Sequence, residues 1–285
     1  MIAFVMGKSV IIVAVVLILV LVLVGVSVFL RKDAIELLKP KPRMVIGNAQ
    51  TIGTREKQDD SFASYVSDYG TLAVVADGIG GFLNGHIASR ITVNTFVEEF
   101  KKGDVTGNIS YYFQHAAKTA NYEIRKKFDD VPCGTTLVST LIIGNELYWM
   151  SVGDSVIALF RDGRIIPINR KQNVENWLED QYFSGKIRRE EAMDHPQSRR
   201  LMNYIGFDGF EGGEVSPRPV TLKKGDKVLL YSDGVEVLNQ IELENLLARK
   251  APAYDLADDI IDAINHKNKK SKDNSTIIII DINKG

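Results

Sequence analysis

The sequence has little cysteine and almost no net charge, and each shortage excludes a class of protein. Cys133 is the single cysteine, so the chain can form no internal disulfide and has no thiolate cluster for structural zinc. A lone cysteine also fits a reducing compartment. Lys and Arg number 35 against 36 Asp and Glu, which gives a net charge of −1. This balance argues against an electrostatic nucleic-acid binder, and no nucleic-acid partner is expected.

Cysteine and histidine chemistry is also poorly supported. No Cys-x5-Arg phosphate loop follows Cys133, so this residue is expected to be small, buried and close to the start of a strand. His115 and His266 fall on predicted helices without a partner at metal-ligand spacing. His86 could lie near a site but is expected to pack at a helix start, and His195 is expected to belong to a turn.

The composition is otherwise that of a globular protein. Hydrophobic residues make up 45% and charged residues 25%, which is typical of ordinary folded domains. From Met44 onward there is no internal repeat, and the only biased tract is Lys267–Lys272, a predicted exposed loop. The length of 285 residues fits one β-rich domain with an appendage.

The appendage is predicted at the beginning of the chain. Residues 9–30 carry no charge and are mostly Val, Leu and Ile; as a helix they would span roughly 33 Å, enough for a bilayer core. A cleaved signal peptide would have a shorter apolar core and a small-x-small cleavage site, whereas this run ends Val28-Phe29-Leu30. An uncleaved transmembrane helix is therefore favoured.

Flanking charge predicts the orientation of this helix. Lys8 precedes the apolar run, and five basic residues follow it within residues 31–43. Basic residues collect on the cytoplasmic side, so the protein is predicted to be single-pass with its larger part in the cytoplasm. The predicted organisation is a short segment 1–8, a transmembrane helix 9–30, a basic juxtamembrane linker 31–43 and a domain 44–285.

Within that domain, apolar runs and helical spacing predict strands and helices in turn. Gly144-Asn145-Glu146 and Arg161-Asp162-Gly163 predict hairpin turns. A short helix is expected after His195-Pro196-Gln197. The predicted strands are 69–76, 135–143, 147–151, 156–160, 164–168, 227–231 and 276–282, and the predicted helices are 84–101, 108–128, 173–193, 242–249 and 253–266.

This pattern indicates an α+β fold. Strands in hairpins with helices collected in pairs favour an antiparallel β-sandwich flanked by helix pairs. The four consecutive isoleucines at 277–280 predict a strand buried on both faces.

Aspartates recur where the hydrophobic segments begin or end. Strand ends at one edge of a sheet are rigid positions from which side chains can converge. Carboxylates that converge without paired cations bind divalent metal, because oxygen ligands suit Mg²⁺ and Mn²⁺. Turn chemistry explains any single Asp-Gly pair, but five groups in this order favour a metal site. The groups are Asp59-Asp60, Asp77-Gly78, Asp154, Asp233-Gly234 and Asp273.

In order, these motifs resemble those of the metal-dependent serine/threonine phosphatases of the protein phosphatase 2C type (PPM), bacterial branch. The resemblance extends from about Asn48 to Asp281, and a segment of about 170–212 is similar to the family's flap. The matching motifs are Arg55-x3-Asp59-Asp60, Asp77-Gly78-x-Gly80-Gly81, Gly134-Thr135-Thr136, Gly153-Asp154-Ser155, Ser232-Asp233-Gly234 and Asp273-Asn274.

The resemblance implies a centre of two Mn²⁺ or Mg²⁺ ions with a possible third, weaker site. Asp77 would bridge the two ions, the carbonyl of Gly78 would bind one of them, and Asp233 and Asp273 would complete one shell. Asp59 would lie at the other ion. The remaining implied roles are support through metal-bound water for Asp60 and the third site for Asp154 with Asp233.

The implied reaction is hydrolysis of phosphoserine or phosphothreonine by a metal-bridging hydroxide, without a phosphoenzyme. Two ions can generate hydroxide at neutral pH and neutralise the phosphoryl group. Arg55 would bind the substrate phosphate, since a guanidinium offers a bidentate fork. Asn274 would orient a neighbouring ligand or water, and Gly78, Gly80 and Gly81 would allow close backbone approach.

The sequence departs from the family pattern at three positions. Asp59 stands where many relatives have Glu, so its metal contact is expected to be weak or water-mediated. Ile79 stands where eukaryotic members have a histidine proposed as general acid; leaving-group protonation would then fall to metal-bound water, and no histidine limb is expected in the pH profile. Val156 stands where an arginine is common.

Three hypotheses of function follow. The favoured one is a membrane-anchored, cytoplasmic-facing phosphatase acting on phosphorylated proteins, with a membrane Ser/Thr kinase and its substrates as implied partners and the lipid bilayer contacted through residues 9–30. The alternative is a membrane-tethered pseudophosphatase that binds phosphoproteins as a regulatory module, motivated by Asp59 and Ile79. A two-metal phosphodiesterase is the third, and the neutral charge argues against it.

Overall fold

In the computed structural model, the described residues are Leu21, Val26, 43–79, 84–128, 131–192, 195–198 and 200–283. The chain divides into two units, residues 1–42 and 43–285. Of the predicted span 9–30, Leu21 and Val26 are described and are helical, and the rest of the span lies outside the described residues. Among the residues that are described, no helix is long and apolar enough to cross a bilayer.

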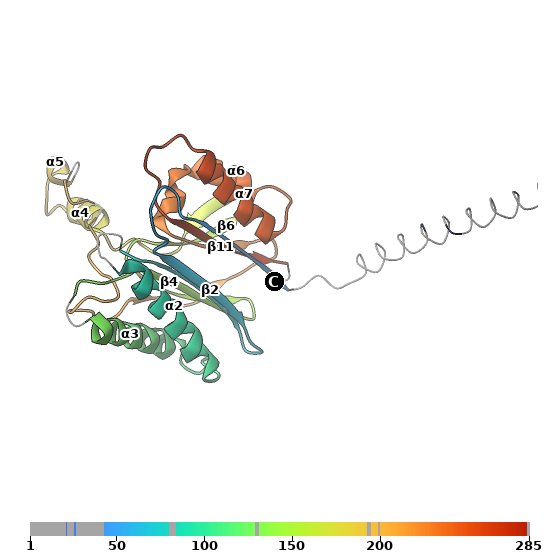
Figure 1. Cartoon of the computed structure of the whole chain (residues 1–285), viewed down its shortest axis with the longest axis horizontal. Helices are drawn as coiled ribbons and strands as arrows, with labels where there is room; N and C mark the ends of the chain where they lie inside the picture. Colours follow the sequence, from blue (N-terminus) through green and yellow to red (C-terminus); the bar gives the residue numbers. More distant parts are fainter. Residues whose placement is uncertain are drawn as a thin grey trace, which may run out of the picture. The chain divides into compact units, whose positions relative to one another are not determined.

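Within the described part of residues 43–285, antiparallel strands form two sheets (Figure 1). One sheet has the order β1-β11-β10-β6-β7, and the other has the order β2-β3-β4-β5-β8 with β9 also paired to β5. The strands are β1 (Met44–Thr51), β2 (Asp60–Val66), β3 (Thr71–Asp77), β4 (Leu137–Ile143), β5 (Glu146–Val152), β6 (Val156–Arg161), β7 (Arg164–Pro167), β8 (Glu214–Val215), β9 (Val220–Thr221), β10 (Lys227–Tyr231) and β11 (Ser275–Ile282).

Helices cover the outer face of each sheet. Helices α2 and α3 pack on the sheet that contains β3 and β4, and α6 and α7 pack on the sheet that contains β10 and β11. Helices α4 and α5 stand out from the sheets (Figure 1). The helices are α2 (Gly85–Lys101), α3 (Ile109–Phe128), α4 (Val174–Phe183), α5 (Arg189–Ala192), the 3₁₀ turn η1 (Asp233–Val237), α6 (Gln240–Leu247) and α7 (Ala253–His266).

The isoleucine run in β11 shows why these layers form. Successive side chains of a strand point to opposite faces, so Ile277 and Ile279 pack under α7 while Ile278 and Ile280 enter the core between the two sheets. All four are fully buried. Each buried side chain of this size contributes roughly 1.5–3 kcal/mol of transfer free energy. The predicted strand buried on both faces and the predicted α+β sandwich are thereby confirmed.

Two predictions about this part of the chain are wrong. The single helix expected over 173–193 is interrupted at 184–188, between α4 and α5. The helix expected after Gln197 is absent from the described residues, where 195–198 form turns and Leu201 and Ile205 form isolated β-bridges. These bridges reach Asn173 and Thr135. Backbone groups that pair with distant strands cannot also form a local helix, so long-range pairing decides the structure of this segment.

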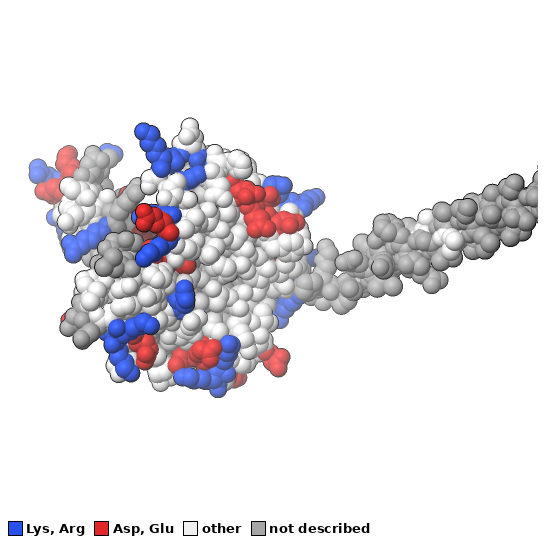
Figure 2. All heavy atoms as spheres, in the orientation of Figure 1, with Lys and Arg blue, Asp and Glu red and all other residues white. Residues whose placement is uncertain are grey.

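Surface charge is mixed on the face seen in Figure 2, where Lys and Arg side chains lie among Asp and Glu side chains. Such an arrangement agrees with the net charge of −1. Interspersed charges of both signs largely cancel at a distance.

Candidate active site

The ends of four strands bring the predicted aspartates to one edge of the sandwich. β2 begins at Asp60 and β3 ends at Asp77, and these two residues are directly paired. β10 ends at Tyr231, which pairs with Ile277 near the beginning of β11. Consequently Asp233, just after β10, and Asp273, just before β11, emerge at the same edge. The expected convergence of the strand ends is observed.

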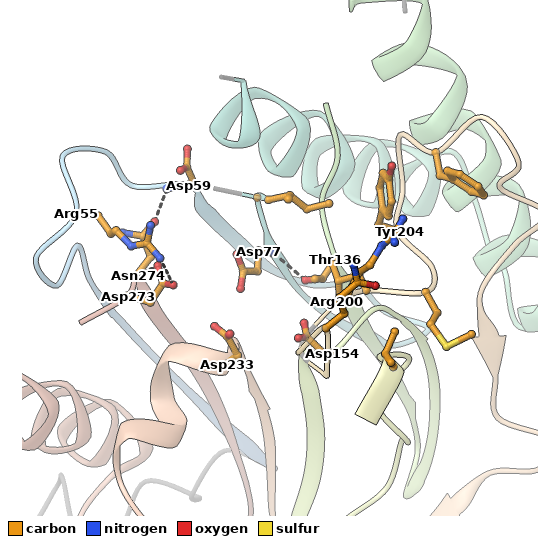
Figure 3. A pocket seen from close by; sticks show the side chains of 17 residues that line it. Arg55, Asp59, Asp77, Thr136, Asp154, Arg200, Tyr204, Asp233, Asp273 and Asn274 are labelled. Atoms are coloured by element: carbon orange, nitrogen blue, oxygen red, sulfur yellow. Dashed lines mark hydrogen bonds and ion pairs between the residues drawn. The ribbon is translucent and has the colours of Figure 1, made fainter. Parts of the chain in front are cut away.

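A cavity of about 660 Å³ opens at this edge (Figure 3). Asp60 does not line it; this side chain is 4% exposed and lines a separate, smaller cavity with Arg90. Every other residue predicted for the site lines the large cavity: Arg55, Asp59, Asp77, Gly78, Asp154, Asp233, Asp273 and Asn274.

Asp77 is held in place through its backbone. Its N–H donates to Thr136 Oγ1 at 3.1 Å, and its carbonyl accepts from the Thr136 N–H at 2.8 Å and from Thr135 Oγ1 at 2.8 Å. Thr136 Oγ1 also lies 2.7 Å from Ser155 Oγ. The Gly-Thr-Thr motif therefore connects the end of β3 to the loop that carries Asp154.

Gly78 shows why a residue without a side chain follows Asp77. A Cβ at this position would lie 2.4 Å from the backbone of Gly85, the first residue of α2. The close approach brings the start of α2 against the cavity. Its carbonyl remains available as an oxygen donor beside Asp77.

Asp59 is positioned by Asn274 and by the first turn of α2. Its N–H donates to Asn274 Oδ1 at 2.7 Å, and its Oδ1 accepts from the His86 N–H at 2.9 Å. The side chain of Asn274 also donates to the carbonyls of Ile52 and Lys57. Asn274 thus connects the loop that carries Arg55 and Asp59 to the beginning of β11.

His86 is closer to the site than helix-start packing alone requires. Its Nδ1 lies 3.6 Å from Asp59 Oδ1, and the side chain is 30% exposed. The residue lies in the first turn of α2, at the helix start as expected, but its ring also faces a predicted metal-binding carboxylate.

Burial and mutual repulsion raise the pKa values of the site carboxylates. Burial raises the pKa of Asp60 to about 6, although a hydrogen bond from Ser232 Oγ at 2.7 Å opposes the shift. Burial, and then the charge of Asp233, raises the pKa of Asp154 to about 6. For Asp77 the pKa is well above its ordinary value, because of burial and then of the charges of the surrounding aspartates.

The pKa of Asp233 is also raised, by burial first and then by the charge of Asp273, with Lys171 acting in the opposite direction. A raised pKa means that the surroundings of the carboxyl group disfavour its negatively charged form. A group of carboxylates in this condition is stabilised when cations enter among them.

Arg55 is engaged with one of these carboxylates. Its Nη2 lies 2.5 Å from Asp273 Oδ2, and both side chains are more than two-fifths exposed. Such an exposed pair contributes little to stability, about 0–1 kcal/mol. Asp273 can therefore exchange Arg55 for another cation at small cost.

The residues present fit divalent cations by the chemistry of their donors. All are oxygens, as Mg²⁺ and Mn²⁺ prefer, and Asp60 Oδ1 is buried without a hydrogen-bond partner among the described residues. As the side chains lie, no three His, Cys, Asp or Glu residues of the described chain converge closely enough to hold one ion. Coordination of one ion by three of these side chains therefore requires them to move closer together.

Several residues that line the cavity were not predicted as site residues, among them Thr136, Arg200 and Tyr204. Thr136 was present in a motif but without a role, and its signal was the motif itself. Arg200 and Tyr204 come from the segment after α5 and line the wall opposite Arg55 (Figure 3). No local sequence pattern marks these two residues as part of a site. Their segment is brought to the cavity by isolated β-bridges to residues that are distant in the sequence.

Cys133 is buried, and burial raises the pKa of its thiol to about 11. Its Sγ donates to the Asn84 carbonyl at 3.3 Å. A thiol in this state is a poor nucleophile. The predicted role as a small buried residue before a strand is confirmed.

Comparison with known proteins agrees with this geometry. The family described as protein phosphatase 2C matches residues 49–274. Protein phosphatase PhpP of Streptococcus pneumoniae is 28% identical over 238 residues, covering 80% of this chain and 93% of PhpP. The chain is also similar to the solved structure of the Streptococcus agalactiae serine/threonine phosphatase, with a TM-score of 0.75, 26% identity and coverage of 84% and 99% of the two chains.

A third similarity is to the catalytic domain of the serine/threonine protein phosphatase PstP, solved in complex with two manganese ions, with a TM-score of 0.67 and 24% identity over 84% of this chain and 98% of that one. Two features agree independently: the ordered motifs match over most of the chain, and the residues they contain meet at one cavity. The chain belongs to the protein phosphatase 2C family of phosphoprotein phosphatases.

Proposed function

We propose that this protein hydrolyses phosphoserine and phosphothreonine in protein substrates with the help of two Mn²⁺ or Mg²⁺ ions. The observation that supports this most directly is the convergence of Asp77, Asp154, Asp233 and Asp273 with Arg55 at one cavity. The serine/threonine specificity of the S. agalactiae relative and the two manganese ions of PstP support it further.

The side chains divide into those that hold metal and those that hold substrate. Asp77, Asp233, Asp273 and the Gly78 carbonyl would hold one or both ions, and Asp59 would lie at the second. Asp60, which is buried and does not line the cavity, would support the site without direct contact with an ion. Asp154 with Asp233 would form a weaker third site. When bound, the ions lower the pKa of a water molecule and neutralise the charge of the phosphoryl group.

Arg55 would bind the phosphate of the substrate. Its present partner, Asp273, is itself a proposed metal ligand, so metal binding and release of Arg55 are coupled. The freed guanidinium can then form a bidentate pair with phosphoryl oxygens. Water would attack phosphorus directly, and the alcohol of serine or threonine would leave without a covalent intermediate.

The alternative, a membrane-tethered pseudophosphatase that binds phosphoproteins as a regulatory module, predicts no turnover in a phosphatase assay. Phosphate release from p-nitrophenyl phosphate and from a phosphothreonine peptide is measured for the full chain with Mn²⁺, with Mg²⁺ and with EDTA. We expect turnover with either metal, none with EDTA, and a loss of at least 100-fold for Asp77→Asn and Asp233→Asn.

Turnover that persists in EDTA, or variants that remain as active as the unaltered protein, would reject the proposed mechanism. Binding of the phosphopeptide without turnover, in a protein that still binds Mn²⁺, would favour the binding module. Circular dichroism of each variant checks that the fold is intact.

We further propose that residues 9–30 anchor the protein in a membrane as a single-pass helix and that the phosphatase unit lies in the cytoplasm. The uncharged run and the basic residues that follow it support this arrangement. Phosphorylated membrane-associated proteins, and a membrane Ser/Thr kinase that phosphorylates them, would then be within reach of the site.

A further inference from the structure

Arg200 has a fixed backbone and an exposed side chain. Its carbonyl accepts from the Val174 N–H at 2.9 Å, and its N–H donates to the Gln197 carbonyl at 2.9 Å. Two residues later, the Met202 N–H donates to the Gln172 carbonyl at 2.9 Å. The segment is thus attached on both sides of Arg200 to the beginning of α4, so the guanidinium extends from a defined point on the cavity wall.

Arg200 and Arg55 are the cationic residues among the described residues that line the cavity. They lie on opposite sides of it: Arg55 is beside Asp273 and Asn274, whereas Arg200 is beside Thr136 and Tyr204 (Figure 3). Arg55 is paired with Asp273. The side chain of Arg200 forms no hydrogen bond or ion pair with the described chain, and so remains able to bind an anion.

The surroundings of Arg200 differ from those of the carboxylates. Leu201, Met202 and Phe207 line the same wall, and Met202 and Phe207 are half exposed at 50% and 41%. The cavity therefore has a group of aspartates suited to metal on one side and a largely apolar wall with one arginine on the other. An apolar wall with a few convergent polar groups is typical of a site that binds an organic ligand.

The volume of the cavity indicates which part of a substrate would contact the wall that carries Arg200. A cavity of about 660 Å³ would be roughly 9 Å across if it were a cube, which about three extended residues span. A phosphorylated side chain alone leaves most of this space unfilled. Residues that neighbour the phosphoresidue in the substrate would therefore lie against the wall that carries Arg200.

We propose that Arg200 binds an anionic group of the substrate, a carboxylate or a second phosphate, within about three residues of the phosphoresidue that is hydrolysed. This inference rests on the proposed phosphatase function and adds a substrate preference to it. A guanidinium accepts carboxylate and phosphate in the same bidentate geometry, so the shared chemistry is an anion held in its fork.

The test uses the full chain with Mn²⁺ and a set of phosphothreonine peptides of equal length. One peptide has alanine at all flanking positions, and the others carry aspartate or a second phosphothreonine at single positions from −3 to +3. Loss of the central phosphate is followed by mass spectrometry, and p-nitrophenyl phosphate reports the reaction without a flanking chain. The variants are Arg200→Gln, Arg200→Lys and, as a control, Arg218→Gln, an exposed arginine away from the cavity lining.

We expect the unaltered protein to prefer at least one acidic peptide over the alanine peptide about five- to tenfold in kcat/KM, mainly through KM. Arg200→Gln should abolish this preference while p-nitrophenyl phosphate and the alanine peptide stay within about twofold. Arg200→Lys should retain part of it, and Arg218→Gln all of it. Preference for aspartate, for the second phosphate or for both identifies the source of the anion.

Two results would overturn the inference. Equal kcat/KM for acidic and alanine peptides at every position would show that no flanking anion is bound. A loss in Arg200→Gln that is as large for p-nitrophenyl phosphate as for peptides would show that Arg200 acts on the reacting phosphoryl group instead. Failure of the unaltered protein to hydrolyse any of these substrates would reject the proposed function itself, and the inference with it.

Discussion

The buried position of the Asp154 carboxylate lowers the stability of the folded protein. Burial, followed by the charge of Asp233, raises its pKa to about 6, compared with about 3.9 in an unfolded chain. A pKa raised by folding means that the contribution to stability is fully present below pH 4 and is lost as the pH rises through 6. At neutral pH without metal, Asp154 therefore destabilises the protein.

The substitution Asp154→Asn removes this penalty. In EDTA at pH 7, we expect the free energy of unfolding in urea to increase by about 1–2 kcal/mol, less than a full two-unit shift would give because the amide is also partly buried. The difference should vanish near pH 4. As a control, Asp258→Asn on the exposed face of α7 should change nothing. A difference that persists unchanged at pH 4 would contradict the electrostatic explanation.

Arg55 couples substrate binding to metal binding through Asp273. Because its Nη2 lies 2.5 Å from Asp273 Oδ2, Arg55→Gln frees that carboxylate and removes a positive charge from the cavity. We expect Mn²⁺ to bind about two- to fivefold more tightly to Arg55→Gln, the gain appropriate to an exposed pair. Titration calorimetry measures the affinity, and kcat/KM for the phosphothreonine peptide should fall in the same variant. Weaker Mn²⁺ binding would show that Arg55 does not compete with metal.

The residues of the site were predictable where they carry a local signature. Asp77, Asp233 and Asp273 each stand beside a strand with a glycine or asparagine next to them, and all three line the cavity. Arg200 has no such signature, because its place depends on hydrogen bonds between its segment and the beginning of α4. His86 was placed correctly at a helix start, but its contact with Asp59 depends on the packing of α2 against the end of β3.

At the scale of elements, strong periodicity made most of the fold predictable. β10 and α7 have the predicted bounds, and most other predicted helices and strands differ by one or two residues. β1 and β2 were not predicted, since each lies at the edge of its sheet and many of its residues are only partly buried. An edge strand has a weaker hydrophobic pattern, and pairing with neighbours decides its structure.

The contact between η1 and β11 fixes the separation of two aspartates. Gly234 follows Asp233, and a Cβ on it would lie 1.9 Å from the Asn274 carbonyl oxygen. Gly234→Ala therefore forces η1 away from β11 and moves Asp233 relative to Asp273. We expect at least a tenfold loss of kcat and a loss of stability of about 1–3 kcal/mol, measured by steady-state kinetics and urea unfolding.

Gly107→Ala is the matched control for this substitution. A Cβ at Gly107 meets nothing within 4 Å, and the backbone there is not in the left-handed region. Activity should be unchanged and stability equal or slightly higher. Equal behaviour of the two variants would show that the approach of η1 to β11 is not tight in solution.

At the scale of the whole phosphatase unit, β1 separates the entry of the chain from the cavity. Met44 pairs with Ile282, and Thr51 pairs with Ser275 beside Asp273. Eight residues of strand cover roughly 26 Å. The chain therefore enters the unit at the end of β1 that lies away from the site, and the Arg43 carbonyl accepts there from the Asn283 N–H at 2.9 Å.

The proposed membrane anchor can be tested separately from the catalytic site. If residues 9–30 cross a membrane, two arginines at the middle of the run should prevent insertion, at about 2.5–3.5 kcal/mol each. We expect the full chain to remain in the membrane fraction after high salt and alkaline carbonate, and Leu19→Arg with Leu23→Arg to be released with metal-dependent activity retained. Leu19→Phe with Leu23→Phe, which stays apolar, should remain bound. Release of the unaltered chain by carbonate would reject the anchor while leaving the catalytic proposal intact.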